Sequence, residues 1–126
     1  MKDLIIEPTN KTPLVEFHLD GKLTLAGNSY PENVRDFYEP VITWVDQLDT
    51  DEINLDLIMD YTNTASAKFL LEMLRKFDIT SRFKTVNINW YYEEDDEDTL
   101  EAGQLLEDIL THSNFKYVEY EKSARE

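Results

Sequence analysis

Residues 53–77 read INLDLIMDYTNTASAKFLLEMLRKF, and this stretch predicts a strand, a polar turn and a helix in that order. In residues 53–59 every second side chain is apolar, which gives a strand one apolar face. From about Thr64 to Phe77 the apolar residues recur at intervals of three and four, as on the buried face of a helix. A strand that leads directly into a helix is the building unit of an α/β fold with parallel strands.

Three strands are expected near the N-terminus. Residues 14–27 alternate apolar and polar side chains on both sides of Asp20-Gly21, which predicts a β-hairpin with a two-residue turn. Gly21 is suited to that turn because glycine tolerates a positive φ. A short strand over residues 4–6 is expected to precede the hairpin and to end before Pro8.

Residues 31–48 predict the first helix, since their apolar side chains again recur at intervals of three and four. We expect Asn28 or Ser29 to cap it, with Pro31 in the first turn, where a missing N–H costs nothing. Pro40 lies inside the pattern and is expected to kink or split the helix.

The C-terminal part repeats the alternation of strand and helix. Residues 86–92 predict a strand, residues 98–110 a helix and residues 115–120 a final strand. The helix is expected to face inward with Leu105, Leu106, Ile109 and Leu110. This order predicts an α/β fold: a mixed, mostly parallel sheet with an N-terminal β-hairpin and about three main helices packed on it. A chain of 126 residues without a linker fits a single domain over 1–126.

The composition excludes several classes of partner. The chain has 12 basic and 27 acidic residues, a net charge of −15, which argues against binding to nucleic acid or to an anionic membrane. It has no cysteine, so neither a disulfide scaffold nor a thiolate metal site is possible. The N-terminus has no secretory apolar region, and we therefore expect a cytoplasmic protein.

Six acidic residues follow the strand predicted over 86–92, from Glu93 through Glu94, Asp95, Asp96 and Glu97 to Asp98. A divalent-metal site is one interpretation, but calcium loops space their ligands at alternate positions and bend at a glycine. The favoured interpretation is a solvated loop that places acids at a helix N-terminus, where the helix dipole stabilises them. A docking patch for a basic partner is the third possibility.

No arrangement of residues typical of catalysis or of a cofactor site occurs in the sequence. His18 lies beside the predicted hairpin turn and His112 just after the last helix, and neither has a nucleophile motif near it. The three glycines cannot form a phosphate-binding loop. Close packing is the expected reason for Gly103. We expect no catalytic residue, no cofactor and no metal.

Residues 60–68, from Asp60 to Lys68, join the strand to the second helix. The simplest interpretation is helix capping by Asn63 or Thr64. Hydroxyl groups at a helix N-terminus are also good phosphoacceptors, because free N–H groups and the helix dipole stabilise an added anion. Residues 64–84 contain five bases and two acids, and Lys68 lies one turn after Thr64.

Three strings in the sequence resemble the SiaC family of bacterial regulatory phosphoproteins over essentially the whole chain. They are Gly27-Asn28-Ser29-Tyr30-Pro31-Glu32-Asn33, Tyr61-Thr62-Asn63-Thr64-Ala65-Ser66 and Trp90-Tyr91-Tyr92-Glu93-Glu94-Asp95-Asp96. The resemblance implies a STAS-like domain, the fold of the anti-sigma-factor antagonists. It also implies a switch protein without catalytic activity.

In that family a Ser/Thr kinase with a histidine-kinase-like ATPase fold phosphorylates a threonine, and a PP2C-type phosphatase removes the phosphate. The unphosphorylated form of the best-known member binds a diguanylate cyclase. The resemblance assigns the phosphoacceptor to Thr64, with Thr62 and Ser66 as alternatives. The expected surroundings of the phosphosite are Asp60, Tyr61, Asn63 and Lys68, and the expected partner-docking residues are Tyr30, Glu93, Glu94, Asp95 and Asp96.

Two alternative functions stay open at this point. Related folds hold nucleotides or lipids at the same strand-to-helix corner, so a small-molecule binding module is the first alternative. A metal enzyme that uses the acidic residues 93–98 is the second. The charge distribution is uneven in either case, because residues 64–84 have a net charge of +3 whereas residues 85–115 contain nine acids and no base.

Overall fold

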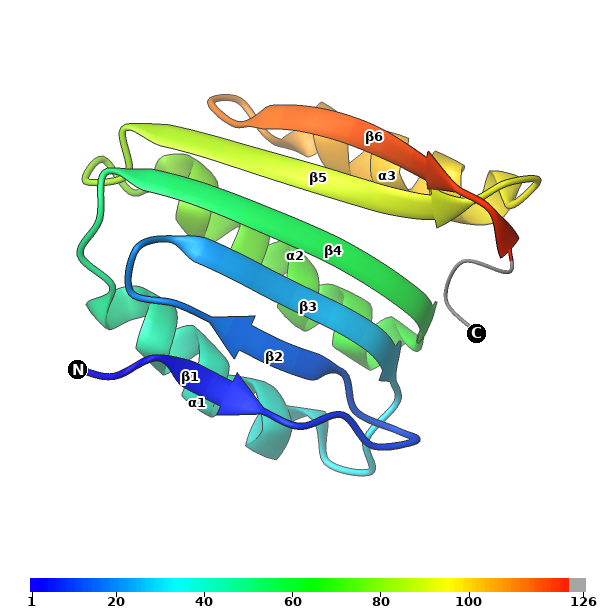
Figure 1. Cartoon of the computed structure of the whole chain (residues 1–126), viewed down its shortest axis with the longest axis horizontal. Helices are drawn as coiled ribbons and strands as arrows, with labels where there is room; N and C mark the ends of the chain where they lie inside the picture. Colours follow the sequence, from blue (N-terminus) through cyan, green and yellow to red (C-terminus); the bar gives the residue numbers. More distant parts are fainter. Residues whose placement is uncertain (123–126) are drawn as a thin grey trace.

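The computed structural model describes residues 1–122 and contains six strands and three helices (Figure 1). The elements are, in chain order, β1 (Leu4–Ile6), β2 (Leu14–Phe17), β3 (Lys22–Ser29), α1 (Val34–Gln47), β4 (Glu52–Thr62), α2 (Thr64–Ile79), β5 (Thr85–Glu93), α3 (Glu97–Ile109) and β6 (Asn114–Tyr120). Every predicted element is present, with bounds that differ by a few residues.

All six strands form one sheet, in which they lie side by side in the order of the sequence. The pairs β1–β2 and β2–β3 are antiparallel, and the pairs β3–β4, β4–β5 and β5–β6 are parallel. The three helices lie on the same face of the sheet and leave the other face uncovered (Figure 1). This arrangement confirms the predicted mixed, mostly parallel sheet with an N-terminal hairpin.

The hydrophobic core lies between the sheet and the helices. It is formed by alternate residues of the central strands and by the inward stripes of α1 and α2. Each fully buried aliphatic side chain contributes roughly 1.5–3 kcal/mol to stability relative to an exposed one. The fully buried members with the largest volumes are Phe17, Leu23, Leu25, Tyr38, Leu48, Ile53, Leu55, Leu57, Met73, Leu74, Phe77 and Ile88.

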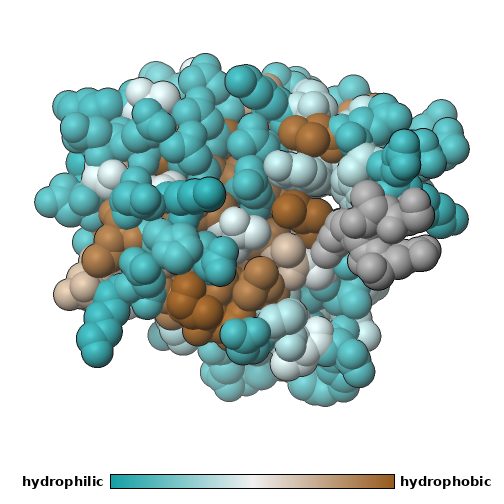
Figure 2. Space-filling view, in the orientation of Figure 1, coloured by the Kyte–Doolittle hydropathy of each residue, from teal (hydrophilic) through white to brown (hydrophobic). Residues whose placement is uncertain are grey.

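The uncovered face of the sheet carries a row of asparagines. Asn54, Asn87 and Asn114 stand opposite one another on β4, β5 and β6. The Asn87 amide donates to Asn54 Oδ1, and the Asn114 amide donates to Asn87 Oδ1, each at 3.0 Å. Figure 2, which views the molecule from this side, shows hydrophobic side chains among the hydrophilic ones. We call Asn54, Asn87 and Asn114 the asparagine ladder.

The turn between β2 and β3 is longer than predicted. His18 N–H donates to the Lys22 carbonyl at 3.0 Å, so Leu19, Asp20 and Gly21 all lie in the turn, and Leu19 is exposed. The prediction of a two-residue turn was therefore wrong. Gly21 has φ +93°, and a Cβ built on it would lie 1.9 Å from the Glu52 carbonyl oxygen. Glycine is required here both for its conformation and because no other side chain fits.

Helix α1 begins later than predicted. Its N-cap is Asn33, whose side chain accepts a hydrogen bond from the Asp36 N–H at 3.2 Å, so the prediction of Asn28 or Ser29 as the cap was wrong. Ser29 is instead the last residue of β3, and Pro31 precedes the helix. Pro40 does not split α1, which continues through it as one helix.

Helix α3 confirms only part of the predicted inward stripe: Leu106 and Leu110 pack against the core, and Leu105 and Ile109 do not. Leu105 and Ile109 are exposed, while Leu106 and Leu110 are partly buried. The buried centre of α3 is Gly103, where a Cβ would lie 2.6 Å from the Trp90 ring. Leu105 is two residues further on and therefore points about 200° away from that contact. The expected close packing at Gly103 is confirmed.

Asp78 joins the end of α2 to the turn after α3. Its carboxylate is buried and accepts hydrogen bonds from Thr111, His112 and Ser113, among them three backbone N–H bonds of 2.8–2.9 Å. Burial would raise the pKa of Asp78, but these hydrogen bonds outweigh it and lower the pKa from 3.8 to about 2.

No helix within residues 1–122 is long and apolar enough to cross a membrane.

We expect Gly103→Ala to destabilise the protein by about 1–3 kcal/mol, because the added methyl group overlaps the Trp90 ring. The expected loss exceeds the helix-propensity gain of about 1 kcal/mol from replacing glycine. Denaturant unfolding measures the difference. The exposed neighbour Gln104 provides the control, since Gln104→Ala should change stability by less than about 0.5 kcal/mol. A Gly103→Ala protein as stable as the wild type would contradict this packing.

We expect Asp78→Asn to cost about 2–3 kcal/mol at neutral pH, because an amide places N–H donors against the donors of residues 111–113. The lowered pKa means that the carboxylate stabilises the fold above pH 3.8 and that this contribution is lost as the pH falls towards about 2. Unfolding measured from pH 7 to pH 2 should show the two proteins converging. The exposed Asp49 is the control: Asp49→Asn should show no such convergence.

Candidate functional site

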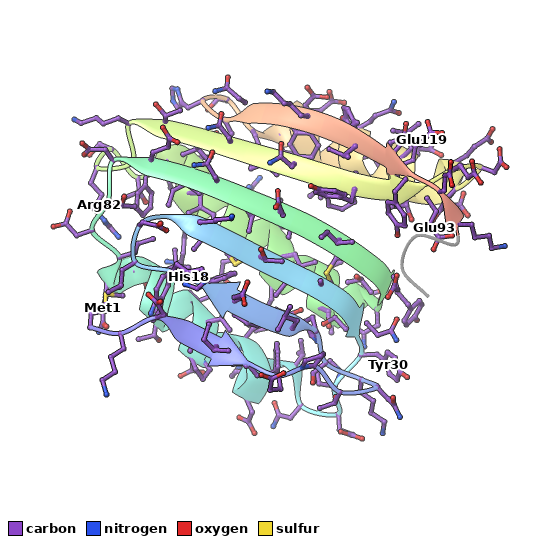
Figure 3. The ribbon with its side chains drawn as sticks, in the orientation of Figure 1. Met1, His18, Tyr30, Arg82, Glu93 and Glu119 are labelled. Carbon is purple, nitrogen blue, oxygen red and sulfur yellow. The ribbon has the colours of Figure 1, made fainter. Side chains whose placement is uncertain are left out.

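The candidate site lies at the carboxyl ends of β3 and β4. Ser29 pairs with Thr62 in the sheet, and the Asn63 N–H donates to the Ser29 carbonyl at 3.0 Å. Two of the strings singled out in the sequence, residues 27–33 and 61–66, therefore meet at the carboxyl ends of these two central strands, which we call this edge of the sheet. Figure 3 labels Tyr30 at this edge.

Thr64 is the first residue of α2. Asn63 is the N-cap, and its side-chain oxygen accepts a hydrogen bond from the Ser66 N–H at 2.8 Å. Thr64 takes no part in this cap hydrogen bond, and this residue is exposed. Because the first N–H groups of a helix have no partner within it, this end favours an added anion.

A group of three buried hydroxyls lies beneath Thr64. Ser29 and Tyr38 share a hydrogen bond of 2.6 Å, and the Ser29 hydroxyl donates to Ser66 at 2.8 Å. Ser29 and Ser66 are completely buried, and Tyr38 nearly so. Burial raises the pKa of Tyr38, which keeps its hydroxyl neutral. We call these residues the hydroxyl triad, and it fastens the start of α2 to β3 and α1.

Two exposed tyrosines lie at the carboxyl ends of β3 and β4, the end of the sheet at which α2 begins. Tyr30 and Tyr61 pack edge to face with ring centroids 5.7 Å apart, although 37% and 57% of their surfaces stay exposed. Tyrosines in this setting are enriched among the residues that dominate protein–protein binding. The structure thus brings together Tyr30, a predicted docking residue, and Tyr61, a predicted neighbour of the phosphosite.

The remaining predicted neighbours lie around the same corner. Thr62 is half-buried at the end of β4, and Asp60 is exposed two residues earlier. Lys68 is exposed one turn after Thr64, at the i+4 spacing at which side chains on a helix meet. The site therefore has one accessible hydroxyl on the helix, with a cation nearby.

The acidic residues follow the carboxyl end of β5, which is parallel to β4, and Figure 3 labels Glu93, the first of them. Asp96 is the N-cap of α3 and accepts from the Thr99 N–H at 3.0 Å, while Glu97 and Asp98 occupy the first turn. The predicted placement of acids at a helix N-terminus is confirmed, although Glu93 is still the last residue of β5. Glu93, Glu94, Asp95 and Asp96 line an open hollow of about 350 Å³ together with Lys122. Within residues 1–122, no three His, Cys, Asp or Glu side chains are grouped so as to hold a metal ion.

Neither histidine belongs to this site. His18 Nδ1 lies 2.9 Å from an Asp3 carboxylate oxygen, and this hydrogen bond raises the pKa of His18. Figure 3 shows His18 near the end of the sheet opposite to Tyr30. The His112 backbone N–H donates to Asp78, and its side chain is exposed. Both histidines therefore make contacts that belong to the fold and lie outside the candidate site.

The model of the SiaC family of regulatory phosphoproteins matches residues 6–120. The chain belongs to this family. An uncharacterized protein of Pseudomonas aeruginosa strain UCBPP-PA14 is 31% identical to it, and the match covers 93% of this chain and 94% of that protein. The SiaC family is one of regulatory proteins rather than of enzymes.

Two solved structures show how closely the fold follows that of a SiaC protein. SiaC of Pseudomonas aeruginosa superposes with a TM-score of 0.84 at 28% identity, covering 95% of this chain and all of that one. SiaC in complex with the diguanylate cyclase SiaD, also from Pseudomonas aeruginosa, gives a TM-score of 0.85 at 28% identity, covering 94% of this chain. In that complex SiaC is the activator of SiaD.

Sequence reasoning missed the hydroxyl triad. Ser29 was expected as a helix cap, and Tyr38 lies within residues 31–48, of which only an apolar helix face was expected, so neither was assigned to the site. A serine that ends a strand and a tyrosine one turn into a helix give no local signal, since only the register of β3 and β4 brings them to Ser66.

We expect Asn63→Ala to destabilise the protein by about 1 kcal/mol, because the N–H of Ser66 loses its cap. Asn63→Asp is the matched variant and should retain most of the stability, since aspartate caps equally well. Denaturant unfolding compares the three proteins. Equal stability of the alanine variant and the wild type would show that the hydroxyl triad alone holds the start of α2.

Proposed function

We propose that this protein is a non-catalytic switch that is reversibly phosphorylated on Thr64 and controls a partner protein through phosphorylation-dependent binding. The supporting observation is the position of Thr64: it is exposed, it opens α2, and it lies directly after the cap residue Asn63. Membership of a family of regulatory phosphoproteins supports the same function. The proposal treats residues 1–126 as a single STAS-like domain that acts in the cytoplasm.

Thr64 is preferred over the two alternative acceptors because of accessibility. Ser66 is completely buried and bonded to Ser29, so a kinase would reach it only if α2 detached from the sheet. Thr62 is half-buried within β4, where its backbone is paired with β3. Thr64 needs neither rearrangement.

The proposed partners come from the family resemblance and from the SiaC–SiaD complex. A Ser/Thr kinase with a histidine-kinase-like ATPase fold would add the phosphate, and a PP2C-type phosphatase would remove it. The effector would be a protein such as a diguanylate cyclase, as SiaD is for SiaC of Pseudomonas aeruginosa. Tyr30, Tyr61 and the acidic residues Glu93–Asp96 lie at the same carboxyl end of the parallel strands as Thr64 and are the proposed docking residues.

Phosphorylation is expected to act on binding rather than on the fold. A phosphate at an exposed helix N-terminus gains only about 0.3–1 kcal/mol from the helix dipole. The same group adds roughly 1.5–2 negative charges to the surface. In a docking face, an unpaired charge costs about 2–5 kcal/mol of binding free energy. The effect on a partner therefore exceeds the effect on stability.

The test is phosphorylation by a kinase of this type with ATP, followed by mass spectrometry of the peptide that spans residues 60–68. We expect phosphate on Thr64, none on a Thr64→Val protein, and normal phosphorylation of a Thr62→Val control. Absence of phosphate from Thr62, Thr64 and Ser66 alike would refute the proposed function.

A Thr64→Asp variant separates folding from binding. Its melting temperature should lie within about 2 °C of the wild type, since a surface substitution changes stability by less than about 0.5 kcal/mol. Its affinity for the effector should fall at least about tenfold. Thr64→Ser is the matched control and should behave as the wild type in both measurements. Unaltered effector affinity of Thr64→Asp would count against the proposed mechanism.

A further inference from the structure

The outward side of α2 forms a ridge that is largely exposed within residues 1–122. Its residues lie at intervals of three and four, so they form one stripe along the helix. In Figure 1 helix α2 lies behind the sheet. The ridge borders an open hollow of about 340 Å³ lined by Lys68, Leu71, Glu72, Arg75, Lys76 and Ile79. We call these six residues the α2 ridge.

The α2 ridge is basic although the chain is strongly acidic. It contains three bases and one acid, whereas the whole chain has a net charge of −15. Lys76 is engaged by Asp46 of α1, with an Nζ–Oδ1 distance of 3.0 Å. Within residues 1–122, Lys68 and Arg75 make no ion pair. Two cations are therefore available to carboxylates from another molecule.

The ridge also exposes apolar surface. Ile79 is 72% exposed, the largest exposed fraction among the exposed large hydrophobic residues, and Leu71, about two turns earlier on the helix, is partly exposed. Isolated exposed apolar side chains are common on protein surfaces. Here, however, they lie on the same stripe as the two unpaired cations. Such a mixture of apolar and charged residues is typical of a surface that packs against another helix.

The shape of the ridge restricts what can cover it. From Lys68 to Ile79 the stripe extends about 17 Å along the helix axis. Ridges with a spacing of three and four pack into the matching grooves of a second helix. An occupant of about three helical turns, with apolar and acidic residues at the same spacing, would cover Ile79 and Leu71 and pair with Lys68 and Arg75.

We propose that the α2 ridge binds an acidic amphipathic helix of a partner protein. This inference rests on the proposed function, because it adds to the docking residues named there a second surface that phosphorylation of Thr64 controls. Thr64 lies four residues before Lys68 and seven before Leu71, so its side chain stands at the N-terminal end of the same stripe. A phosphate there pairs with Lys68 and repels the carboxylates of the partner helix. Phosphorylation thus removes one cation from the ridge and adds negative charge.

A second copy of this chain is the competing occupant. Helix α3 is itself acidic and exposes Leu105 between Glu101 and Asp108. Association of two copies, however, brings together two chains that each have a net charge of −15. That repulsion opposes the pairing, whereas a partner protein contributes only the charge of its own surface. Charge complementarity therefore favours a partner protein.

The test uses two synthetic helical peptides of about 16 residues, long enough to span α2. Both place leucines at intervals of three and four; one carries glutamates on the flanks of this stripe, and the other carries lysines at the same positions. Each is titrated into the ¹⁵N-labelled full chain and followed by NMR. We expect the acidic peptide to shift the amide signals of residues 64–79 and the basic peptide to leave them unchanged.

Matched variants identify the residues responsible. Arg75→Glu should weaken binding of the acidic peptide at least about tenfold, which corresponds to about 1.4 kcal/mol. Lys84→Glu makes the same charge change at an exposed position after α2 and should weaken it by less than about twofold. Chain phosphorylated on Thr64, or Thr64→Asp, should also bind the acidic peptide less tightly. Equal loss in Arg75→Glu and Lys84→Glu would mean that net charge alone drives binding, and would overturn the proposal.

Two further results would overturn it. Equal binding of the acidic and basic peptides would show no preference for acids. Shifts in both α2 and α3 that grow with protein concentration in the absence of peptide would assign the ridge to a second copy. The outcome is separable from the proposed function, since mass spectrometry of the 60–68 peptide in Arg75→Glu reports phosphorylation whether or not the acidic peptide binds.

Discussion

The structure of the site depends on the parallel pairing of β3 with β4. This pairing sets Ser29 beside Thr62 and lets the Ser29 carbonyl accept the Asn63 N–H. From that point the chain enters α2, whose first residue is Thr64. The Ser29 hydroxyl then holds Ser66 and Tyr38 in the same place. Because both ends of these contacts are buried, an accessible residue on α2 rests on a rigid base.

The order of the elements could be predicted from the sequence because the periodicities are strong. Residues 53–77 show a strand and then a helix without ambiguity, and the structure has β4 and α2 there. The packing of Gly103 was also predicted, since a glycine inside a helix needs a reason. The family could be inferred as well, from the three stretches of sequence quoted at the outset. These stretches lie at the ends of β3, β4 and β5, where the strands meet the loops that carry the site.

What could not be predicted depends on contacts between distant segments. Part of the inward side of α3 was misassigned because its leucines suggested a stripe, whereas the Trp90 ring fits only against Gly103. The hairpin turn was misjudged because the register that puts Phe17 opposite Leu23 leaves Leu19 outside the strands. The closeness of Tyr30 to Tyr61 follows from strand register as well, and it has no local signature in either string.

The asparagine ladder has a consequence for how the sheet assembles. Parallel strands have no hairpin to fix their alignment, so β4, β5 and β6 must find it through contacts between distant segments. A slip of one residue in β5 would turn Asn87 into the core and expose Val86 and Ile88. It would also break both amide hydrogen bonds at once. The asparagine ladder thus destabilises misaligned strands through contacts on the face of the sheet that the three helices leave uncovered.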